Sequence, residues 1–173
     1  LAEQKLQQIA EHLDLQVIVL RLFNHTHKSQ GPGFFLPSLH QQILNAEEKI
    51  KTGNLNIVRD LGALQDLLQA FTAIVESVTF SSAGSRNHTT PAPEKFLVYN
   101  ICSGHGKNLS LVAEELSKQL GKKVEFEVDP SRSRPNEPFS IVGSSKKFQH
   151  DFAWVPHHAM NEVELVKSFL QNI

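Results

Sequence analysis

The sequence predicts an α/β fold, because strand-like and helix-like segments alternate along it. Apolar residues recur every three or four positions at 1–13 and 61–78, which is typical of amphipathic helices. The unbroken apolar run at 17–20 (VIVL) is typical of a strand buried on both faces of a parallel sheet. Residues 124–128 alternate strictly, as in a half-exposed edge strand. This alternation of strands and helices places the chain in the α/β class.

Periodicity and turn residues predict the individual elements. In the first half we expect a helix, a strand, a second helix, a short strand, a long helix and an exposed loop, at residues 1–13, 16–23, 36–49, 53–60, 61–78 and 80–94. In the second half, a strand at 96–101 is followed by a turn at 103–106 and a helix with Asn108 as its N-cap. A basic loop begins at Asp129, and a final helix begins near Met160.

Length and composition indicate one globular domain. The 173 residues are enough for a hydrophobic core, and 40% of them are hydrophobic. The net charge of −1 gives no general attraction to nucleic acid or to an anionic membrane, and no apolar run approaches the ~20 residues that span a bilayer. With a single cysteine, Cys102, and no signal peptide, we expect a cytoplasmic protein without an internal disulfide. The chain starts at Leu1 inside a helical pattern, so we interpret it as a fragment.

The stretch 17–37 is the first candidate for a binding site. Its apolar strand turns polar at Asn24 and His25 and continues into the turn Gly31-Pro32-Gly33. In open α/β sheets, ligands bind beyond the carboxyl ends of the strands, which is where these polar residues lie. The alternative, an ordinary strand followed by a capped turn, is equally consistent with the pattern.

Arginines in loops are the best sign of a ligand. Arg59 and the pair Arg132 and Arg134 carry guanidinium groups, which match phosphate oxygens in bidentate geometry. A diphosphate needs two such groups to be held in one pose. The alternative is that the arginines form surface ion pairs with acidic neighbours, namely Asp60, Asp129 or Glu137.

Other motifs carry weaker signals. Residues 103–106 lack the spacing of a phosphate-binding loop and are interpreted as a plain turn. The nine histidines are not spaced with cysteines or carboxylates as in zinc sites, so we expect no metal. Phe34 and Phe35 can stack on a base or belong to the core, and Cys102 is expected to be an inert core residue. These patterns alone do not predict a reaction.

Six short motifs occur in an order that resembles a known family. They are LRLFNHT, GFFLPSLHQQI, GNLNIVRD, VYNICSG, VDPSRSRPNE and AWVP. Their order resembles the carboxyl-terminal half of the extended short-chain dehydrogenase/reductases, also called NAD-dependent epimerases/dehydratases, which act on nucleotide-diphosphate sugars. The nearest groups are the GDP-mannose 4,6-dehydratases and the GDP-4-keto-6-deoxymannose reductases. The resemblance covers nearly the whole chain except residues 80–94.

The resemblance implies a fold and a division of the chain. The fold is the carboxyl-terminal part of a Rossmann-like parallel sheet plus a smaller α/β substrate-binding subdomain. Residues 1–35 would be the last part of the dinucleotide-binding domain, and residues 36–173 mainly the substrate-binding subdomain. Residues 61–101 would return to the Rossmann-like sheet.

The resemblance also assigns binding residues. The nicotinamide end of NAD or NADP would approach Leu22, Phe23 and His25. The nucleotide-diphosphate sugar would be bound by Asn24, Phe34, Phe35, Pro37, Arg59, Arg134 and Glu137. Asn24 and Arg59 would reach the diphosphate, the aromatic segment would line the base pocket, and Arg134 with Glu137 would contact phosphate and ribose.

Departures from the family pattern limit this assignment. The turn after Asn-His is His27-Lys28-Ser29-Gln30, where the family often has Gly-Pro or an arginine, and Gly62 replaces an Asp. The family's Gly-rich loop and Tyr-x-x-x-Lys pair lie in its amino-terminal half, and the only tyrosine here, Tyr99, matches a structural position.

Two hypotheses follow. In the first, a missing amino-terminal half, encoded upstream or carried by a partner, completes an NAD(P)-dependent dehydratase, reductase or epimerase, and the chain alone is inactive. A homodimer is expected, as is usual in the family. In the second, the chain is a truncated relative without activity that binds a nucleotide sugar or another protein.

Overall fold

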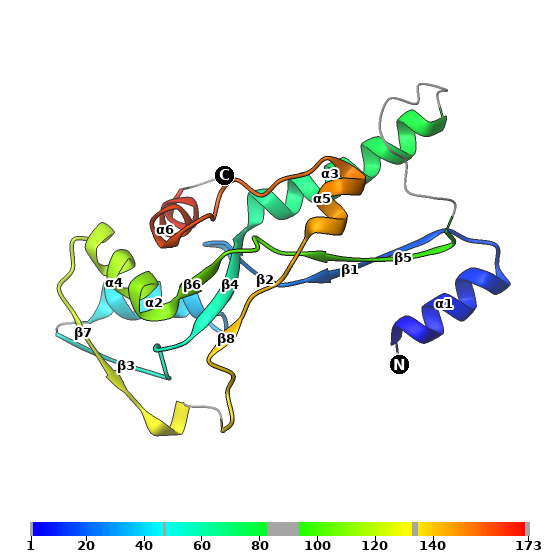
Figure 1. Ribbon diagram of the computed structural model, residues 1–173. Coiled ribbons are helices and arrows are strands. Elements are labelled where there is room, and N and C mark those ends of the chain that lie inside the picture. The colour runs from blue at the N-terminus through cyan, green and yellow to red at the C-terminus, as the bar shows by residue number, and fades with distance from the viewer. Residues whose placement is uncertain (1, 47, 83–93, 133–134, 172–173) are drawn as a thin grey trace.

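The computed structural model describes residues 2–46, 48–82, 94–132 and 135–171. In chain order the elements are α1 (Ala2–His12), β1 (Val17–Leu22), β2 (Asn24–Thr26), α2 (Phe35–Asn45), β3 (Lys49–Thr52), β4 (Val58–Ala63), α3 (Leu64–Ser82), β5 (Phe96–Ile101), β6 (Gly106–Asn108), α4 (Leu109–Gln119), β7 (Glu125–Val128), η1 (Pro130–Arg132), β8 (Ser140–Ile141), α5 (Lys146–Phe152) and α6 (Glu162–Leu170). In Figure 1, α1, β1 and β5 occupy one end of an elongated molecule, and α2, α4, β3 and β7 occupy the other.

Strands β1 and β5 form a parallel pair at the end that carries α1. The register places Val17 beside Phe96 and Leu22 beside Ile101. Residues 17–20 are half-buried, so the expectation of a strand buried on both faces was wrong. Strand β1 pairs with β5 alone among the described strands, which leaves its other edge accessible.

The chain leaves this pair at Phe23 and enters a second sheet. The Phe23 N–H still donates to the Ile101 carbonyl at 3.0 Å, and the next residue begins β2. Strand β2 pairs in parallel with the second half of β4, so that Asn24 lies beside Leu61. Strand β4 also pairs with β6 in antiparallel and with β8 in parallel. This change of partner brings the polar residues after β1 next to β4.

Strands β3 and β7 form a separate parallel pair, with Ile50 beside Phe126. Strand β7 was predicted but β3 was not, because the second helix was expected to run to residue 49 and residues 50–52 were left unassigned. That helix, α2, ends at Asn45 instead. In β3, Ile50 and Thr52 are buried while the two lysines are exposed. Four residues are too few for periodicity to separate a strand from a helix end.

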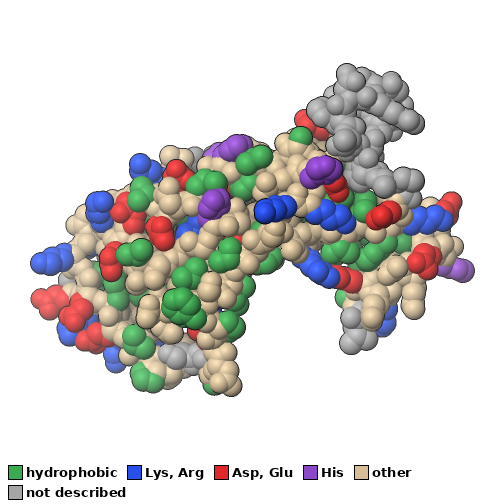
Figure 2. Space-filling model, viewed as in Figure 1, with side chains coloured by type: hydrophobic (Ala, Val, Ile, Leu, Met, Phe, Trp, Pro, Cys, Tyr) green, Lys and Arg blue, Asp and Glu red, His purple; other side chains and the backbone are tan. Residues whose placement is uncertain are grey.

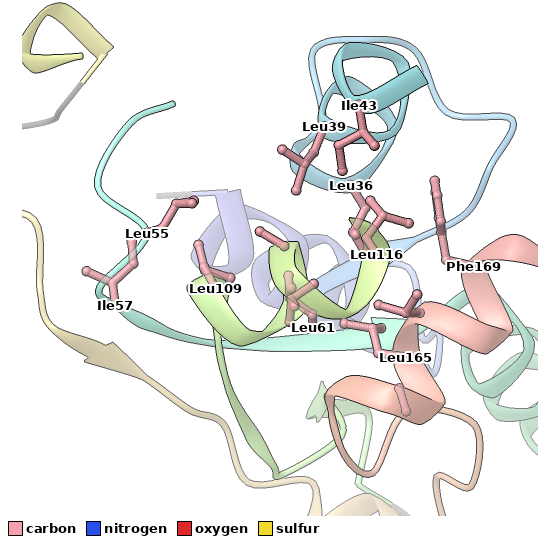
Figure 3. Close-up of a cluster of buried hydrophobic side chains, with 14 of the residues drawn as sticks. Leu36, Leu39, Ile43, Leu55, Ile57, Leu61, Leu109, Leu116, Leu165 and Phe169 are labelled. Carbon is pink, nitrogen blue, oxygen red and sulfur yellow. The ribbon is translucent and has the colours of Figure 1, made fainter. Parts of the chain in front are cut away.

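Two clusters of buried side chains form the core. In the larger cluster, α2, α4 and α6 pack together with side chains from β3 and β4 (Figure 3). The smaller cluster combines aliphatic side chains with an aromatic cluster, in which Tyr99 on β5 packs edge-on against Phe148 and Phe152 at ring distances of 5.5 and 5.4 Å. The Tyr99 hydroxyl donates to Asp151 at 2.7 Å, and burial raises its pKa. Tyr99 is thus a core residue.

Several boundaries differ from expectation. A turn and a short strand were expected within 53–60; the strand runs from Val58 to Ala63, and the long helix begins at Leu64 instead of Leu61. Pairing with β2 keeps the last three residues of β4 extended, so tertiary contacts override the helical pattern. Helix α5 and strand β6 were missed, because both are too short for a clear period. In the expected loop at 80–94, residues 80–82 belong to α3, and residues 83–93 lie outside the described residues.

The described surface mixes charges and some apolar side chains. Figure 2 shows acidic and basic side chains side by side on the viewed face. Leu6, Ile9 and Leu13, at helical spacing along and just after α1, are 41–57% exposed. Within the described residues, no helix combines the length and apolar character needed to cross a membrane.

Helix α4 allows a direct test of the larger core. Replacing the fully buried Leu116 by alanine should lower the free energy of unfolding by about 2–5 kcal/mol, because transfer and cavity costs add. The matched control is Leu111→Ala on the same helix, whose side chain is 50% exposed and which should change stability by less than ~1 kcal/mol. Urea denaturation measures both, and equal effects would contradict this description of the core.

Candidate functional site

A pocket of about 620 Å³ lies where β1 gives way to β2. Its walls come from the end of β1, β2, the start of α2, the loop before β4, and residues near the end of η1. The lining residues include Leu22, Phe23, Asn24, His25, Gln30, Phe34, Phe35, Leu55, Arg59, Arg132 and Glu137. Eight of the ten predicted site residues therefore line one pocket. Whether they bind a ligand there is a separate question.

Arg59 is the buried cation of this pocket. Only 10% of its side chain is exposed, and its guanidinium donates to Glu137 Oε1 at 2.9 Å and to the Val58 carbonyl at 2.8 Å. A longer bond of 3.4 Å reaches the Phe139 carbonyl. Arg59 thus forms the ion pair with Glu137 that was considered as the alternative to ligand binding. The pair lies in the pocket wall and not on the open surface. These bonds fix the plane of the guanidinium group and leave two of its five N–H donors for a ligand.

A hydrogen bond to a nearby backbone carbonyl orients the His25 ring. Its Nδ1 lies 2.8 Å from the Phe23 carbonyl, and because a carbonyl can only accept, Nδ1 carries the proton. Burial lowers the pKa of His25, which leaves the ring neutral at pH 7 with Nε2 as an acceptor. Gly62 lies opposite in the β2–β4 register, and a Cβ there would lie 2.8 Å from the ring. A glycine at this position lets the imidazole lie directly against β4.

The aromatic segment divides between the pocket and the core. Phe34 precedes α2, lines the pocket and is 55% exposed, while Phe35 is half-buried and also contacts the larger core. Pro37 is buried in the first turn of α2 and is not among the lining residues. Of the residues in this segment, Phe34 and Phe35 are therefore the aromatic ones that line the pocket and are available to a base.

The basic loop contributes Arg132 to the pocket. Its guanidinium donates to the Lys51 carbonyl at 2.6 Å and lies 3.7 Å from Asp129, so the expected ion pair with Asp129 forms as well. Arg134, the other arginine of this loop, lies outside the described residues. The side chain of Arg132 is about half exposed, which leaves it accessible to an anion.

Asp60 is a buried carboxylate that sequence reasoning treated only as an ion-pair partner. It accepts hydrogen bonds from the Ser103 N–H and hydroxyl at 3.0 and 2.6 Å and from Gly104 at 3.0 Å. A fourth bond comes from the Gly143 N–H at 3.2 Å. The turn at 103–106 is therefore no phosphate cradle in this structure, because the N–H groups of Ser103 and Gly104 bind the protein's own carboxylate and that of His105 donates to the Ser103 hydroxyl. It leads into β6 before the expected helix begins.

Cys102 and the potential metal-ligating side chains were the remaining candidates for chemistry. The thiol of Cys102 is fully buried, and burial raises its pKa. No group of three or more His, Cys, Asp and Glu side chains in the described ranges is arranged to hold a metal ion.

Solved structures share the fold of this chain. The chain superposes on RMD from Pseudomonas aeruginosa complexed with NADPH with a TM-score of 0.76 and 21% identity, covering 98% of this chain and 52% of that one. A UDP-glucose 4-epimerase from Bifidobacterium longum, in complex with NAD+ and UDP, gives 0.72 at 18% identity and 96% and 50% coverage. The α/β fold with its parallel strands thus matches about half of an epimerase/dehydratase structure.

Sequence comparisons give the family. A family model described as GDP-mannose 4,6 dehydratase matches residues 1–166. A GDP-6-deoxy-D-mannose reductase from Pseudomonas aeruginosa is 26% identical over 146 residues, covering 82% of this chain and 43% of the reductase. A GDP-mannose 4,6-dehydratase from Sordaria araneosa is 27% identical over 168 residues, covering 85% and 30%. The chain belongs to the GDP-mannose 4,6-dehydratase family, as a distant relative that spans less than half the length of these two proteins.

Gly62 provides a test of the site geometry. In Gly62→Ala the new methyl group should displace the His25 ring toward solvent, which raises the His25 pKa toward its ordinary value and lowers stability by about 1–3 kcal/mol. NMR titration of the His25 ring measures the shift. Gly33→Ala is the matched control, because a Cβ at Gly33 has no atom within 4 Å. An unchanged His25 titration in Gly62→Ala would refute the contact.

Proposed function

We propose that this chain is the nucleotide-sugar-binding, carboxyl-terminal half of an NAD(P)-dependent dehydratase, reductase or epimerase acting on a nucleotide-diphosphate sugar. Family membership supports the reaction class. The GDP-mannose pathway is the preferred assignment, because the family model and three of the curated relatives name GDP-mannose or GDP-6-deoxy-D-mannose in their descriptions. The observation that carries the proposal is the pocket in which Arg59, Asn24, Phe34 and Glu137 converge.

The pocket residues have distinct tasks in this proposal. Arg59, already oriented by Glu137, would donate its remaining N–H groups to the diphosphate, with the exposed amide of Asn24 as a second donor. Phe34 would cover one face of the base, and Glu137 would accept from ribose hydroxyls. Arg132 lies on the same pocket and would add a second positive charge. Together they would hold the substrate in one orientation.

NAD or NADP fits the site only in part. Leu22 offers a half-exposed apolar side chain and His25 a neutral ring at the polar end of β1, which suits the nicotinamide end. The cofactor, when bound, would exchange a hydride with the sugar. No Gly-rich dinucleotide loop occurs in the 173 residues, so these residues would contact the reactive end and not the rest of the cofactor.

Proton transfer is the step that these residues do not supply. The family resemblance requires a Tyr-x-x-x-Lys pair, and Tyr99 is buried in the aromatic cluster with its hydroxyl bonded to Asp151. We infer that a second half, upstream in the same chain or in a partner, provides the pair and extends the sheet at β1. The accessible edge of β1 and the exposed Leu6, Ile9 and Leu13 beside it support this inference.

A second candidate is a binding module without turnover. It is favoured by one observation: the described pocket contains Arg59, Asn24 and Glu137 although the chain lacks the Tyr-x-x-x-Lys pair. Such a protein would bind the same nucleotide sugars and transfer no hydride. Binding and turnover therefore have to be measured separately.

Isothermal titration calorimetry with GDP-mannose tests the binding assignment. Arg59→Lys should weaken binding at least about tenfold, because an ammonium cannot donate in the bidentate geometry of a guanidinium. Arg21→Lys is the matched control, since Arg21 pairs with Glu3 and does not line the pocket. Absence of binding by the unmodified protein, or equal affinities for both variants, would contradict the proposal.

Intact mass and amino-terminal sequencing of the protein purified from its source test whether the inferred second half exists. We expect a mass well above 19.4 kDa, with a Gly-rich loop and Tyr-x-x-x-Lys ahead of Leu1, or a copurifying chain that carries them. The isolated 173 residues should show no change in NADPH absorbance with a nucleotide sugar, while the completed protein should. Light scattering in the same experiment tests the expected homodimer. Turnover by the 173 residues alone would overturn this assignment.

A further inference from the structure

Lys107 on β6 has an unusual position for a lysine. Among the described residues, it is the one lysine with no exposed surface. Its ammonium donates to the Ser103 hydroxyl oxygen at 2.6 Å and to the His105 carbonyl at 2.9 Å. Burying an ammonium group costs a large free energy of desolvation, so its burial requires interactions that offset this cost.

Ser103 connects Lys107 to Asp60. The same hydroxyl that accepts from Lys107 donates to Asp60 Oδ1 at 2.6 Å. The resulting chain of ammonium, hydroxyl and carboxylate places a positive charge behind the buried Asp60. Each of these two hydrogen bonds has one ionised partner, the ammonium in the first and the carboxylate in the second. Such charge-assisted hydrogen bonds are stronger than those between neutral groups.

Asp60 in turn fixes the segment that orients Arg59. Its other carboxylate oxygen accepts from the Gly143 N–H at 3.2 Å, at the end of the segment 137–143. Gly143 has no room for a side chain, because a Cβ would lie 2.7 Å from Cys102 Sγ and from the Phe23 ring. The same segment supplies Glu137 and the Phe139 carbonyl, which both bind Arg59. Movement at Asp60 would therefore move the partners of Arg59.

We propose that Lys107 is a positioning residue of the nucleotide pocket, whose charge acts through Ser103 and Asp60 to hold the segment 137–143 against Arg59. The proposal rests on the proposed function, since it assigns Lys107 to the affinity of that same pocket. Lys107 would touch neither substrate nor cofactor.

Loss of the charge has a defined consequence. Burial lowers the pKa of Lys107 to about 8, although several acidic groups oppose the shift. The titratable or charged groups around it are Asp60 on β4, Asp66 on α3, Glu162 on α6, Cys102 after β5, Arg59 opposite in the β4–β6 register and the neutral His25 beside Asp60. As the pH rises through 8, Asp60 loses its nearby positive charge, and the affinity for a nucleotide-diphosphate sugar should fall.

Stability should change in the opposite direction over the same range. The pKa of Lys107 is lower in the folded than in the unfolded protein, so the unfolded state binds more protons between pH 8 and 10.5. The contribution of Lys107 to the free energy of unfolding therefore rises with pH in that window. A merely structural lysine would not couple falling affinity to rising stability.

The test is GDP-mannose binding by calorimetry at pH 7.0 and 9.5, with urea denaturation at both values. Lys107→Met should bind about tenfold more weakly at pH 7.0 and show no further loss at pH 9.5, whereas the unmodified protein should lose about tenfold between the two. Lys118→Met is the control, since Lys118 is 77% exposed on α4, and it should behave as the unmodified protein. Ser103→Ala removes the hydroxyl that links Lys107 to Asp60 but keeps the lysine, so it should abolish the pH dependence of binding. This variant replaces Lys107→Met in the test if Lys107→Met does not fold.

The outcomes separate the two proposals. Binding by the unmodified protein with the same pH dependence in Lys107→Met or Ser103→Ala would overturn the role of Lys107 and leave the proposed function intact. Absence of binding by the unmodified protein at pH 7.0 would overturn the proposed function, and this proposal with it.

Discussion

The hydrogen bonds of the Asp60 carboxylate are the interaction on which the rest of the structure depends. They join the central strand β4 to the turn after β5 and to Gly143, three segments that are far apart in sequence. A carboxylate this deeply buried is tolerated only when its lone pairs are satisfied, and four protein donors satisfy them here. These hydrogen bonds therefore fix the backbone next to Arg59, the residue that precedes Asp60.

Much of the fold could be predicted from the sequence, because apolar residues recur at a regular spacing in its longer helices and strands. Helices α1, α2, α3, α4 and α6, and strands β1, β5 and β7, were each predicted, with the start of α3 wrong by three residues. The strands that were missed or misplaced, β2, β3, β4, β6 and β8, are short or owe their limits to pairing with distant segments. Leu61–Ala63 illustrates the point: the local pattern is helical, and only β2 keeps it extended.

The candidate site was predicted unevenly, for a physical reason. Asn24 and His25 combine polarity with a position after an apolar strand, which sequence can show; Arg59 was singled out by its guanidinium group in an expected loop, but it lies inside β4. Asp60 and Lys107 look like ordinary surface charges in sequence, and only their burial reveals them. Pro37 was assigned to the base pocket by resemblance, yet the first turn of α2 buries it away from the lining, a matter of helix orientation that no local pattern encodes.

Parallel pairing also has a consequence for how the chain folds during synthesis. Strand β1 begins at Val17, but its partner residue in β5, Phe96, is about 80 residues later in the chain. At roughly 5–20 residues per second, a ribosome would deliver the partner strand about 4–16 seconds after β1. Closing such a loop costs entropy before any contact forms, so folding by this route is slow. Until then β5 cannot cover its edge of β1, so any earlier shielding of the apolar run 17–20 has to come from another segment or from a chaperone.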